Sequence, residues 1–325
     1  MAMASKIKVG VLRGGPSREH EISLKSGQTV LKNMPENYFP IDIFIDKEGV
    51  WHVHGIPRAP EKILRKVDVC FNALHGEYGE DGQAQHFLDL FSMPYTGSGR
   101  LASAFAMHKG HSKKILSRHG IKSPYGKILR KEETSSEKIA ELFRTFPNPS
   151  VIKPVALGSS IGVSVAKNFS EFEKALEIAF AHSPFVMIEE YISGREATCG
   201  IIDSFRGEEN YALLPVEIIP PSSSDFFDYD AKYGVGSNTI HPGRFSAMEK
   251  YEIQNASRLA HKILGLRHYS RSDFIVSPSR GVYFLEVNSL PDLASDSSYV
   301  ESLNAVGASL GDFLNHVLVL ALSGK

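Results

Sequence analysis

The sequence is poor in cysteine, in excess charge and in long apolar runs. Cys70 and Cys199 are the only cysteines in 325 residues, which excludes a disulfide-stapled scaffold. The 36 basic and 37 acidic residues leave a net charge of -1, so no broad field attracts nucleic acid or an anionic membrane. No apolar run approaches the roughly 20 residues that span a bilayer, and the start lacks the apolar run of a signal peptide. These absences predict a cytoplasmic protein that binds small ligands locally, with no nucleic-acid or membrane partner.

The N-terminal part of the chain alternates apolar runs with an amphipathic stretch. Runs at 7–12, 41–45 and 67–74 predict strands, and residues 17–32 predict a helix that follows a Gly-Gly turn. The third strand leads into a polar, glycine-punctuated loop at 75–82. Open parallel sheets bind ligands at the carboxyl ends of their strands. The loop is therefore a candidate site on a first α/β domain.

The remainder of the chain divides into two further segments. A helix predicted at 102–119 leads into a smaller middle segment with a strand at 151–154 and a helix at 170–180, which a capping box starting at Ser170 would open. Longer strands separated by polar loops follow, and a helix at 309–322 ends the pattern. Three lobes are the simplest interpretation.

A lysine and a glycine-containing loop in the middle segment suggest a phosphate site. Lys153 ends an apolar strand, and the loop from Gly158 to Gly162 follows it. Positive charge and unobstructed backbone N–H groups suit a polyphosphate. The loop lacks the Gly-Lys-Ser/Thr ending of a Walker A motif. Taken alone, it is equally typical of a plain glycine turn.

Two late strand-like runs carry the clearest chemical pattern. Side chains two residues apart on a strand share a face, so Arg271 faces the same way as Asp273, and Glu286 the same way as Asn288. If the strands pair as a hairpin, three oxygen-bearing side chains and a guanidinium converge. Mg²⁺ usually binds proteins through one or two carboxylates plus substrate phosphates. The alternative is the solvated face of an antiparallel sheet, but a phosphate loop in the same chain favours the metal.

Other groups have ordinary explanations as well as functional ones. Glu19 lies at the start of a predicted helix, where the helix dipole stabilises a carboxylate in any protein. The loop 228–234 combines lysine with tyrosines between polar residues and a glycine, which also describes a surface excursion. Cys70, in an apolar strand, is expected to be a buried small hydrophobe.

Taken together and in this order, the motifs resemble the D-alanine–D-alanine ligases of the ATP-grasp superfamily. The matching pieces extend over nearly the whole chain, at 14–23, 73–76, 79–82, 94–99, 107–109, 151–162, 189–196, 229–233 and 286–291. The resemblance implies an α/β, three-lobed ATP-grasp fold. Its lobes would be an N-terminal parallel-sheet domain at 1–108, a small central subdomain at 109–191 and a C-terminal subdomain at 192–325. ATP would lie between the last two, and the amino-acid site would face the first.

The resemblance also implies roles for the residues that match the family's motifs. The positions expected to bind ATP are Lys109, Lys153, Ser159, Ser160, Glu189, Glu190, Ile192, Glu196 and Lys232. Two Mg²⁺ ions, for which Mn²⁺ could substitute, would be bound by Asp273, Glu286 and Asn288. The amino-acid substrates would contact Glu19, His75, Lys232, Arg271 and Ser297, and the catalytic set would be Glu19, Ser159, Tyr233 and Arg271. Within these sets Glu189 and Ile192 would meet the adenine edge, and Glu196 the ribose.

The implied reaction makes D-alanyl-D-alanine for peptidoglycan synthesis. The carboxylate of the first D-alanine takes a phosphoryl group from ATP, and the amine of the second attacks the acyl phosphate. Glu19 would take the first ammonium, Arg271 would stabilise the oxyanion, and the segment 229–236 would close to exclude water. The family also implies a homodimer.

The sequence departs from the family pattern after the expected metal ligands. The family usually has Pro-Gly where this chain has Pro291-Asp292, and Asp296 adds a second carboxylate nearby. Asp292 is expected to disfavour a glycine conformation and to add negative charge close to the developing oxyanion. Two alternatives therefore stay open: a related carboxylate–amine ligase with another second substrate, and an ATP-binding homologue that has lost turnover.

Overall fold

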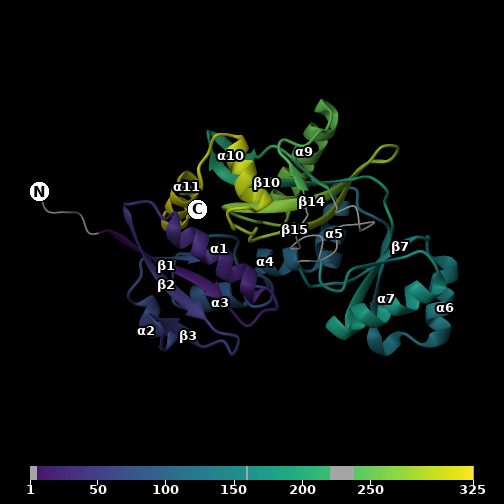
Figure 1. Cartoon of the computed structure of the whole chain (residues 1–325), viewed down its shortest axis with the longest axis horizontal. Helices are drawn as coiled ribbons and strands as arrows, with labels where there is room; N and C mark the ends of the chain where they lie inside the picture. The colour runs from purple at the N-terminus through teal and green to yellow at the C-terminus, as the bar shows by residue number, and fades with distance from the viewer. Residues whose placement is uncertain (1–5, 159, 220–237, 325) are drawn as a thin grey trace, which may run out of the picture.

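The computed structural model describes residues 6–158, 160–219 and 238–324, which form an elongated α/β molecule (Figure 1). Within these residues the strands form three sheets of five, four and six strands. The five-stranded sheet and the four-stranded sheet lie toward opposite ends of the molecule, with the six-stranded sheet between them. The three sheets agree with the three-lobed α/β fold predicted from the sequence.

The N-terminal sheet has the strand order β4-β3-β2-β1-β5, and β1 pairs in parallel with both of its neighbours, β2 and β5. Its strands are β1 (Ile7–Gly14), β2 (Tyr38–Ile45), β3 (Trp51–Val53), β4 (Ile56–Pro57) and β5 (Val69–Asn72), and its helices are α1 (His20–Lys32), α2 (Pro60–Leu64) and α3 (Gln83–Leu90). The three predicted strands and the first helix are confirmed. The predicted loop follows β5, at the carboxyl edge of the parallel strands, and Cys70 is fully buried.

The central sheet is antiparallel, in the order β6-β9-β7-β8. Its elements are β6 (Gly126–Arg130), a 3-10 turn (Lys131–Glu133), α6 (Ser136–Thr145), β7 (Ser150–Pro154), β8 (Ser164–Ala166), α7 (Phe169–His182) and β9 (Phe185–Glu190). The capping box predicted at Ser170 is wrong. The side chain of Asn168 caps α7 instead, by accepting a hydrogen bond from the backbone N–H of Glu171 at 3.0 Å.

The C-terminal sheet carries the predicted hairpin. Its elements are β10 (Arg195–Phe205), β11 (Glu208–Ala212), β12 (Val216–Ile219), β13 (Asn238–Ile240), α9 (Ala247–Ile263), β14 (Tyr269–Ser277), β15 (Gly281–Asn288), α10 (Ser298–Ala305) and α11 (Leu310–Leu322). β14 and β15 pair in antiparallel fashion with Asp273 opposite Glu286 and Arg271 opposite Asn288, which confirms the hairpin. The register shifts directly after Asp273, so a bulge ends the aligned, charged part of the hairpin.

The helix predicted at 102–119 is two helices, α4 (Arg100–Met107) and α5 (Lys109–Ser117). The break falls at His108, whose φ of -85° and ψ of 91° are not helical. Its side chain accepts a hydrogen bond from the backbone N–H of His111 and so caps the second helix. The break therefore places Lys109, one of the residues expected to bind ATP, at the first position of α5.

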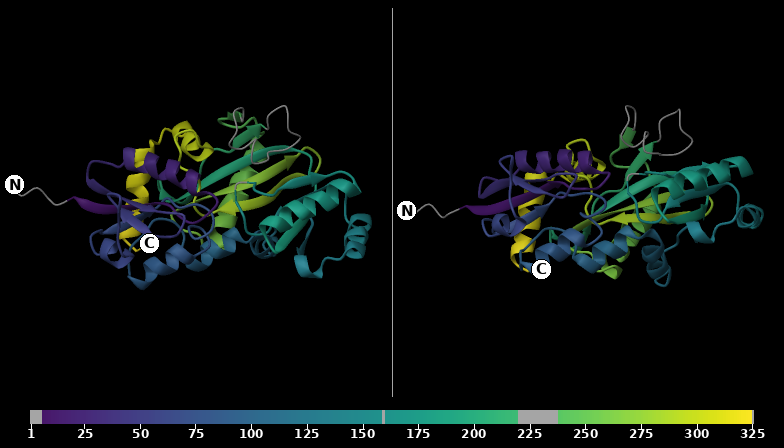
Figure 2. Two further views of the ribbon diagram at one scale, coloured as in Figure 1. Left: turned by 60° about the horizontal axis from the view of Figure 1, so that its bottom comes forward. Right: turned by 90° about the horizontal axis from the view of Figure 1, so that it is seen from below.

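The N-terminal and C-terminal lobes share one hydrophobic core. Val9 and Phe71 of the N-terminal sheet pack in one apolar cluster with Phe313 and Val317 of α11, so the last helix covers the first sheet (Figure 2). The predicted boundaries at 108/109 and 191/192 stay a prediction. Among the described residues no single helix has the length and apolar composition to cross a membrane; α10 and α11 reach that length only together, across a 99° bend.

Candidate active site

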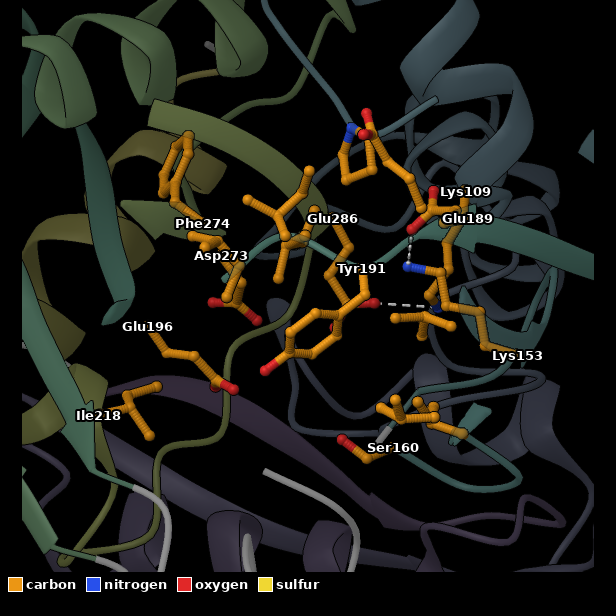
Figure 3. A pocket seen from close by; sticks show the side chains of 18 of the residues that line it. Lys109, Lys153, Ser160, Glu189, Tyr191, Glu196, Ile218, Asp273, Phe274 and Glu286 are labelled. Atoms are coloured by element: carbon orange, nitrogen blue, oxygen red, sulfur yellow. Dashed lines mark ion pairs between the residues drawn. The ribbon is translucent and has the colours of Figure 1, made fainter. Parts of the chain in front are cut away.

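A cleft of about 1040 Å³, counting the space open to solvent, lies between the central and C-terminal sheets (Figure 3). Its apolar walls come from both sheets and the segments beside them, and include Val151, Val163, Val165, Ile192, Phe274 and Leu285. Charged side chains project into the same cleft, among them Lys153 from one side and Glu196 and Asp273 from the other. The cleft therefore combines an apolar slot for a flat group with a charged end.

Lysines and glutamates at the charged end form buried ion pairs. The Nζ of Lys109 lies 3.0 Å from Oε2 of Glu286 and donates to the carbonyl oxygen of Leu157 at 2.5 Å. The Nζ of Lys153 lies 2.8 Å from Oε2 of Glu189. Because each ion has an opposite partner, the cost of taking these charges out of water is offset.

Lys113 is a buried cation outside the set of site residues predicted from the sequence. It lies one turn after Lys109 on α5 and forms an ion pair with Oε1 of Glu189, whose other oxygen faces Lys153. Burial lowers the pKa of Lys113 to about 7, although Glu189 acts in the opposite direction. Burial would raise the pKa of Glu189, but the two lysines outweigh it and leave that pKa below its usual value. The i, i+4 spacing of the two lysines on a helix was the available signal.

The residues predicted near the adenine and ribose occupy different environments. The carboxylate of Glu189 is held by the two lysines, and that of Glu190, which also lines the cleft, is paired with Arg280 at 2.9 Å. Ile192 is 7% exposed and lines the cleft. Glu196 lies at its opposite wall, near Tyr191 and Asp273 in Figure 3. The protein's own cations thus engage the side chains of both consecutive glutamates.

The three predicted metal ligands lie on the β14–β15 hairpin. Asp273 forms a two-point ion pair with Arg271, both contacts being 2.9 Å, and accepts a hydrogen bond from Oγ1 of Thr198 at 2.6 Å. The Nδ2 of Asn288 donates to Asp273 at 3.3 Å. In the described part of the chain no three His, Cys, Asp or Glu side chains form a protein cage for a metal. Two carboxylates and an amide fit the kind of Mg²⁺ site that substrate phosphates complete.

A second hollow of about 340 Å³ adjoins the cleft and shares Lys109, Leu157 and Glu286 with it. Glu19, at the start of α1, lines it and is 8% exposed. A Cβ atom on Gly76 would lie 2.5 Å from Oε2 of Glu19, and one on Gly158 would lie 2.8 Å from it. A Cβ atom at either position would displace the Glu19 carboxylate, so this carboxylate packs against the backbone of the N-terminal loop and of the central loop at once. Gly76 also has a φ of 67°, which favours glycine.

Glu80 is a second carboxylate of this hollow, and it lies outside the set of site residues predicted from the sequence. It accepts hydrogen bonds from the backbone N–H groups of Gly76 at 2.8 Å and Leu290 at 3.2 Å. Burial and the nearby charge of Glu19 raise the pKa of Glu80 to about 8. Its motif was recognised at 79–82, but a motif does not reveal that two carboxylates meet across a fold.

His75 and Asp292 meet through a serine. The ring of His75 is buried, with Nε2 2.9 Å from Oγ of Ser26, and burial lowers its pKa. Asp292 accepts a hydrogen bond from the same Oγ at 2.5 Å. Asp292 is not among the described non-glycine residues with positive φ. The expectation that this position disfavours a non-glycine residue is therefore wrong, because the backbone here is not left-handed.

Ser160 and Ser297 are predicted residues that lie outside the helices and strands. Ser160 lines the cleft with a φ of 57°. Ser297, expected to contact an amino-acid substrate, is the N-cap of α10 and accepts from the backbone N–H of Val300 at 3.3 Å. The expected residues Ser159, Lys232 and Tyr233, with the segment 229–236, lie outside the described residues.

Comparisons with known proteins match D-alanine–D-alanine ligases over nearly the whole chain. A family model for the D-ala D-ala ligase C-terminus matches residues 115–319, and one for the N-terminus matches 8–63 and 56–98. The chain is 37% identical over 321 residues to the D-alanine–D-alanine ligase of Geobacter sulfurreducens, covering 97% of this chain and 94% of that protein. It is 35% identical over 322 residues to that of Pelotomaculum thermopropionicum, covering 97% of both.

Solved structures agree. The VanG D-Ala:D-Ser ligase from Enterococcus faecalis has a TM-score of 0.84 at 30% identity, covering 98% of this chain and 100% of that one. The D-alanine–D-alanine ligase from Bacillus anthracis has a TM-score of 0.80 at 31% identity, covering 98% of each. With the nucleotide-sized cleft and the adjoining carboxylate-lined hollow, these matches show that the chain belongs to the D-alanine–D-alanine ligase family.

Proposed function

We propose that the protein joins two D-alanines to D-alanyl-D-alanine with consumption of ATP, for the synthesis of peptidoglycan precursors. The observation that carries the proposal is the continuity of the two spaces. Lys109 and Glu286 line both the cleft and the hollow. A phosphoryl group held at the end of one space therefore faces a carboxylate held in the other, as positioned transfer requires.

The cleft supports the nucleotide assignment. Lys109 and Lys153 would bind the phosphates, and the loop with Ser160 would cover them. Because both glutamate side chains at 189–190 are held by cations, contacts with the adenine edge fall to the backbone from Glu189 to Ile192. Glu196 would bind the ribose, with further ATP contacts from Ser159 and Lys232.

Asp273, Glu286 and Asn288 would hold Mg²⁺, in two ions, through their oxygens. When bound, the metal neutralises charge on the transferring phosphoryl group. In the structure Lys109 neutralises the carboxylate of Glu286, and Arg271 neutralises that of Asp273. The chain thus places cations and carboxylates in alternation at the point where phosphate charge must be held.

The hollow supports the amino-acid assignment. Glu19 would bind the ammonium of the first D-alanine, and His75 would help to hold that substrate. ATP supplies the phosphoryl group that turns the first carboxylate into an acyl phosphate, which the second amine attacks. Arg271 would stabilise the oxyanion formed in that attack. Ser297 and Lys232 would contact the second amino acid, and Tyr233 and Ser159 would join Glu19 in closing the site.

Phosphate release from ATP, measured across a panel of D- and L-amino acids with mass identification of the product, tests the proposal. We expect release with D-alanine and the dipeptide as product. Release only with D-serine or another acceptor would indicate a different second substrate, and ATP binding without release would indicate loss of turnover. Either result would overturn the proposal.

We further propose that the protein works as a homodimer in the cytoplasm, where ATP is available. Light scattering of the purified chain at micromolar concentration gives the mass directly. A monomer's mass across the concentration range of the activity assay would contradict the dimer.

A further inference from the structure

A hydrogen-bonded bridge joins the C-terminal lobe to the loop 75–82, which follows β5 and begins with His75. Asp292 follows β15, and its Oδ1 accepts from Oγ of Ser26, on α1, at 2.5 Å and from the backbone N–H of Ala294 at 2.9 Å. Ser26 is fully buried. Its Oγ also lies 2.9 Å from Nε2 of His75, which the sequence places directly before Gly76. Three segments far apart in sequence therefore meet at one hydroxyl.

The proton count at Ser26 decides the direction of each bond. A serine hydroxyl has one proton and two lone pairs. The backbone N–H of Leu293 donates to one lone pair at 3.1 Å, and the short contact with the Asp292 carboxylate has the length of an O–H···O⁻ hydrogen bond. The proton is thus directed to Asp292. The second lone pair is left for His75, so Nε2 must carry a hydrogen.

We propose that Asp292 is a positioning residue for the first-substrate site: by taking the hydroxyl proton of Ser26, it makes Ser26 an acceptor for His75 and keeps the ring fixed as a donor at Nε2. The meaning of the bridge for substrate binding rests on the proposed function, because His75 holds the first D-alanine only under that assignment.

A second bridge supports this reading of the loop. The backbone N–H of Leu290 donates to Glu80 of the N-terminal lobe, and Glu80 also holds Gly76, the neighbour of His75. The residues after Asn288 are thus tied to the N-terminal lobe on both sides of Pro291. Asp292 accordingly couples the segment that follows the expected metal ligands to the loop that receives the first substrate.

Nitrogen-15 NMR of histidine-labelled protein tests the bridge without any substrate. The His75 signal is assigned by its loss in His75→Gln, and spectra are taken near pH 8, above the lowered pKa of the ring. We expect a protonated Nε2 in the wild type. In Asp292→Ala the Ser26 hydroxyl turns to the ring, so Nε2 loses its hydrogen and the other tautomer appears. Asp292→Asn keeps an acceptor oxygen and should resemble the wild type.

An unprotonated Nε2 in the wild type, or an unchanged tautomer in a folded Asp292→Ala, would overturn the proposal. If Asp292→Ala does not fold, Ser26→Ala is measured instead. This variant removes the hydroxyl that accepts the hydrogen bond from Nε2, so the Nε2 signal must change. An unchanged Nε2 signal in Ser26→Ala would also overturn the proposal. These readouts do not depend on D-alanine. They therefore separate failure of the bridge from failure of the proposed function.

Kinetics then tests its consequence. Asp292→Ala should raise KM for the first D-alanine about threefold to tenfold, the range of one hydrogen bond, with a smaller change in kcat. Asp292→Asn should restore most of the affinity. Glu77→Ala is the matched control, because it removes an exposed charge from the loop of His75 and should leave KM unchanged. In a Ser26→Ala background the effect of Asp292→Ala should vanish. An equal effect in that background would show that Asp292 does not act through Ser26.

Discussion

Two glutamates on either side of Lys109, the buried Glu189 and the partly buried Glu80, behave in opposite ways. Glu189, on the nucleotide side, has a pKa below its usual value because Lys113 and Lys153 outweigh its burial. Glu80, on the amino-acid side, has a pKa raised to about 8 because burial and Glu19 outweigh its two backbone hydrogen bonds and the charge of Arg271. Burial disfavours the charged form at both sites, so the neighbours decide the outcome.

The difference follows the chemistry proposed for each side. On the nucleotide side, lysines must be held ready for phosphate, and carboxylates such as Glu189 and Glu286 keep them in place. On the amino-acid side, carboxylates collect where a substrate ammonium would bring the missing positive charge. Two lysines share the single carboxylate of Glu189 on the nucleotide side, whereas Glu19 and Glu80 lie together on the amino-acid side. The first arrangement suits an anionic substrate and the second a substrate with an ammonium group.

Glu286→Gln should have the largest effect, because Glu286 lines both spaces and is an expected metal ligand. We expect a fall in kcat of roughly 10²–10³-fold, the size seen when one electrostatic contact to a transition state is lost, and a requirement for more Mg²⁺. Activity against Mg²⁺ concentration at fixed ATP measures both. Glu208→Gln, at an exposed site, is the control. An ordinary Mg²⁺ curve in Glu286→Gln would remove Glu286 from the metal site.

Lys113→Met removes one of the two lysines that are paired with Glu189. The environment of Glu189 should then resemble that of Glu80, where burial of the carboxylate is not offset by an adjacent lysine pair. We expect a loss of about 3 kcal/mol in the free energy of unfolding, because a buried carboxylate loses a partner, and weaker ATP binding because Lys153 is less firmly held. Urea denaturation and ATP titration measure the two effects.

The next residue offers a matched control for that change. Lys114 is exposed on the same helix, and Lys114→Met removes the same charge and adds the same side chain. Equal losses of stability in the two variants would show that Glu189 does not depend on Lys113.

Glu80→Gln should alter the dependence of stability on pH. An unfolded chain loses this proton near the usual value of 4.5, whereas the folded protein keeps it to about pH 8. The folded state therefore binds more protons between these values, and its stability falls as pH rises through that window. Denaturation at pH 5, 6.5 and 8 should show a steeper decline in the wild type than in Glu80→Gln. Parallel profiles would mean that Glu80 is already ionised at pH 5.

The nucleotide side was more predictable from the sequence than the amino-acid side. Residues such as Asp273 and Glu286 lie on a hairpin, where period-two alternation and a short turn fix which side chains face together. The break at His108 was missed because residues 102–119 have good helical periodicity, and only the side-chain cap onto His111 reveals it.

Contacts between lobes were beyond the reach of the sequence. Ser26 and Asp292 are separated by 266 positions, and no local pattern indicates that a helix of one lobe meets a loop of another. Lys113 and Glu80, two groups of the site with large pKa shifts, were missed for the same reason. Both shifts come from burial and from charges on distant segments, whereas motifs report only what is adjacent in the chain.

Glu190→Gln should have the smallest effect, although Glu190 follows Glu189 directly. Its partner Arg280 has a side chain that is 45% exposed, so water screens the pair and its loss should cost less than about 1 kcal/mol of stability. ATP affinity should also change little if the adenine edge is read by the backbone. Glu189→Gln, measured beside it by ATP titration and urea denaturation, should be far more damaging. A rise of about tenfold in KM for ATP in Glu190→Gln, equivalent to roughly 1.4 kcal/mol, would place that carboxylate on the nucleotide and make the two neighbours alike.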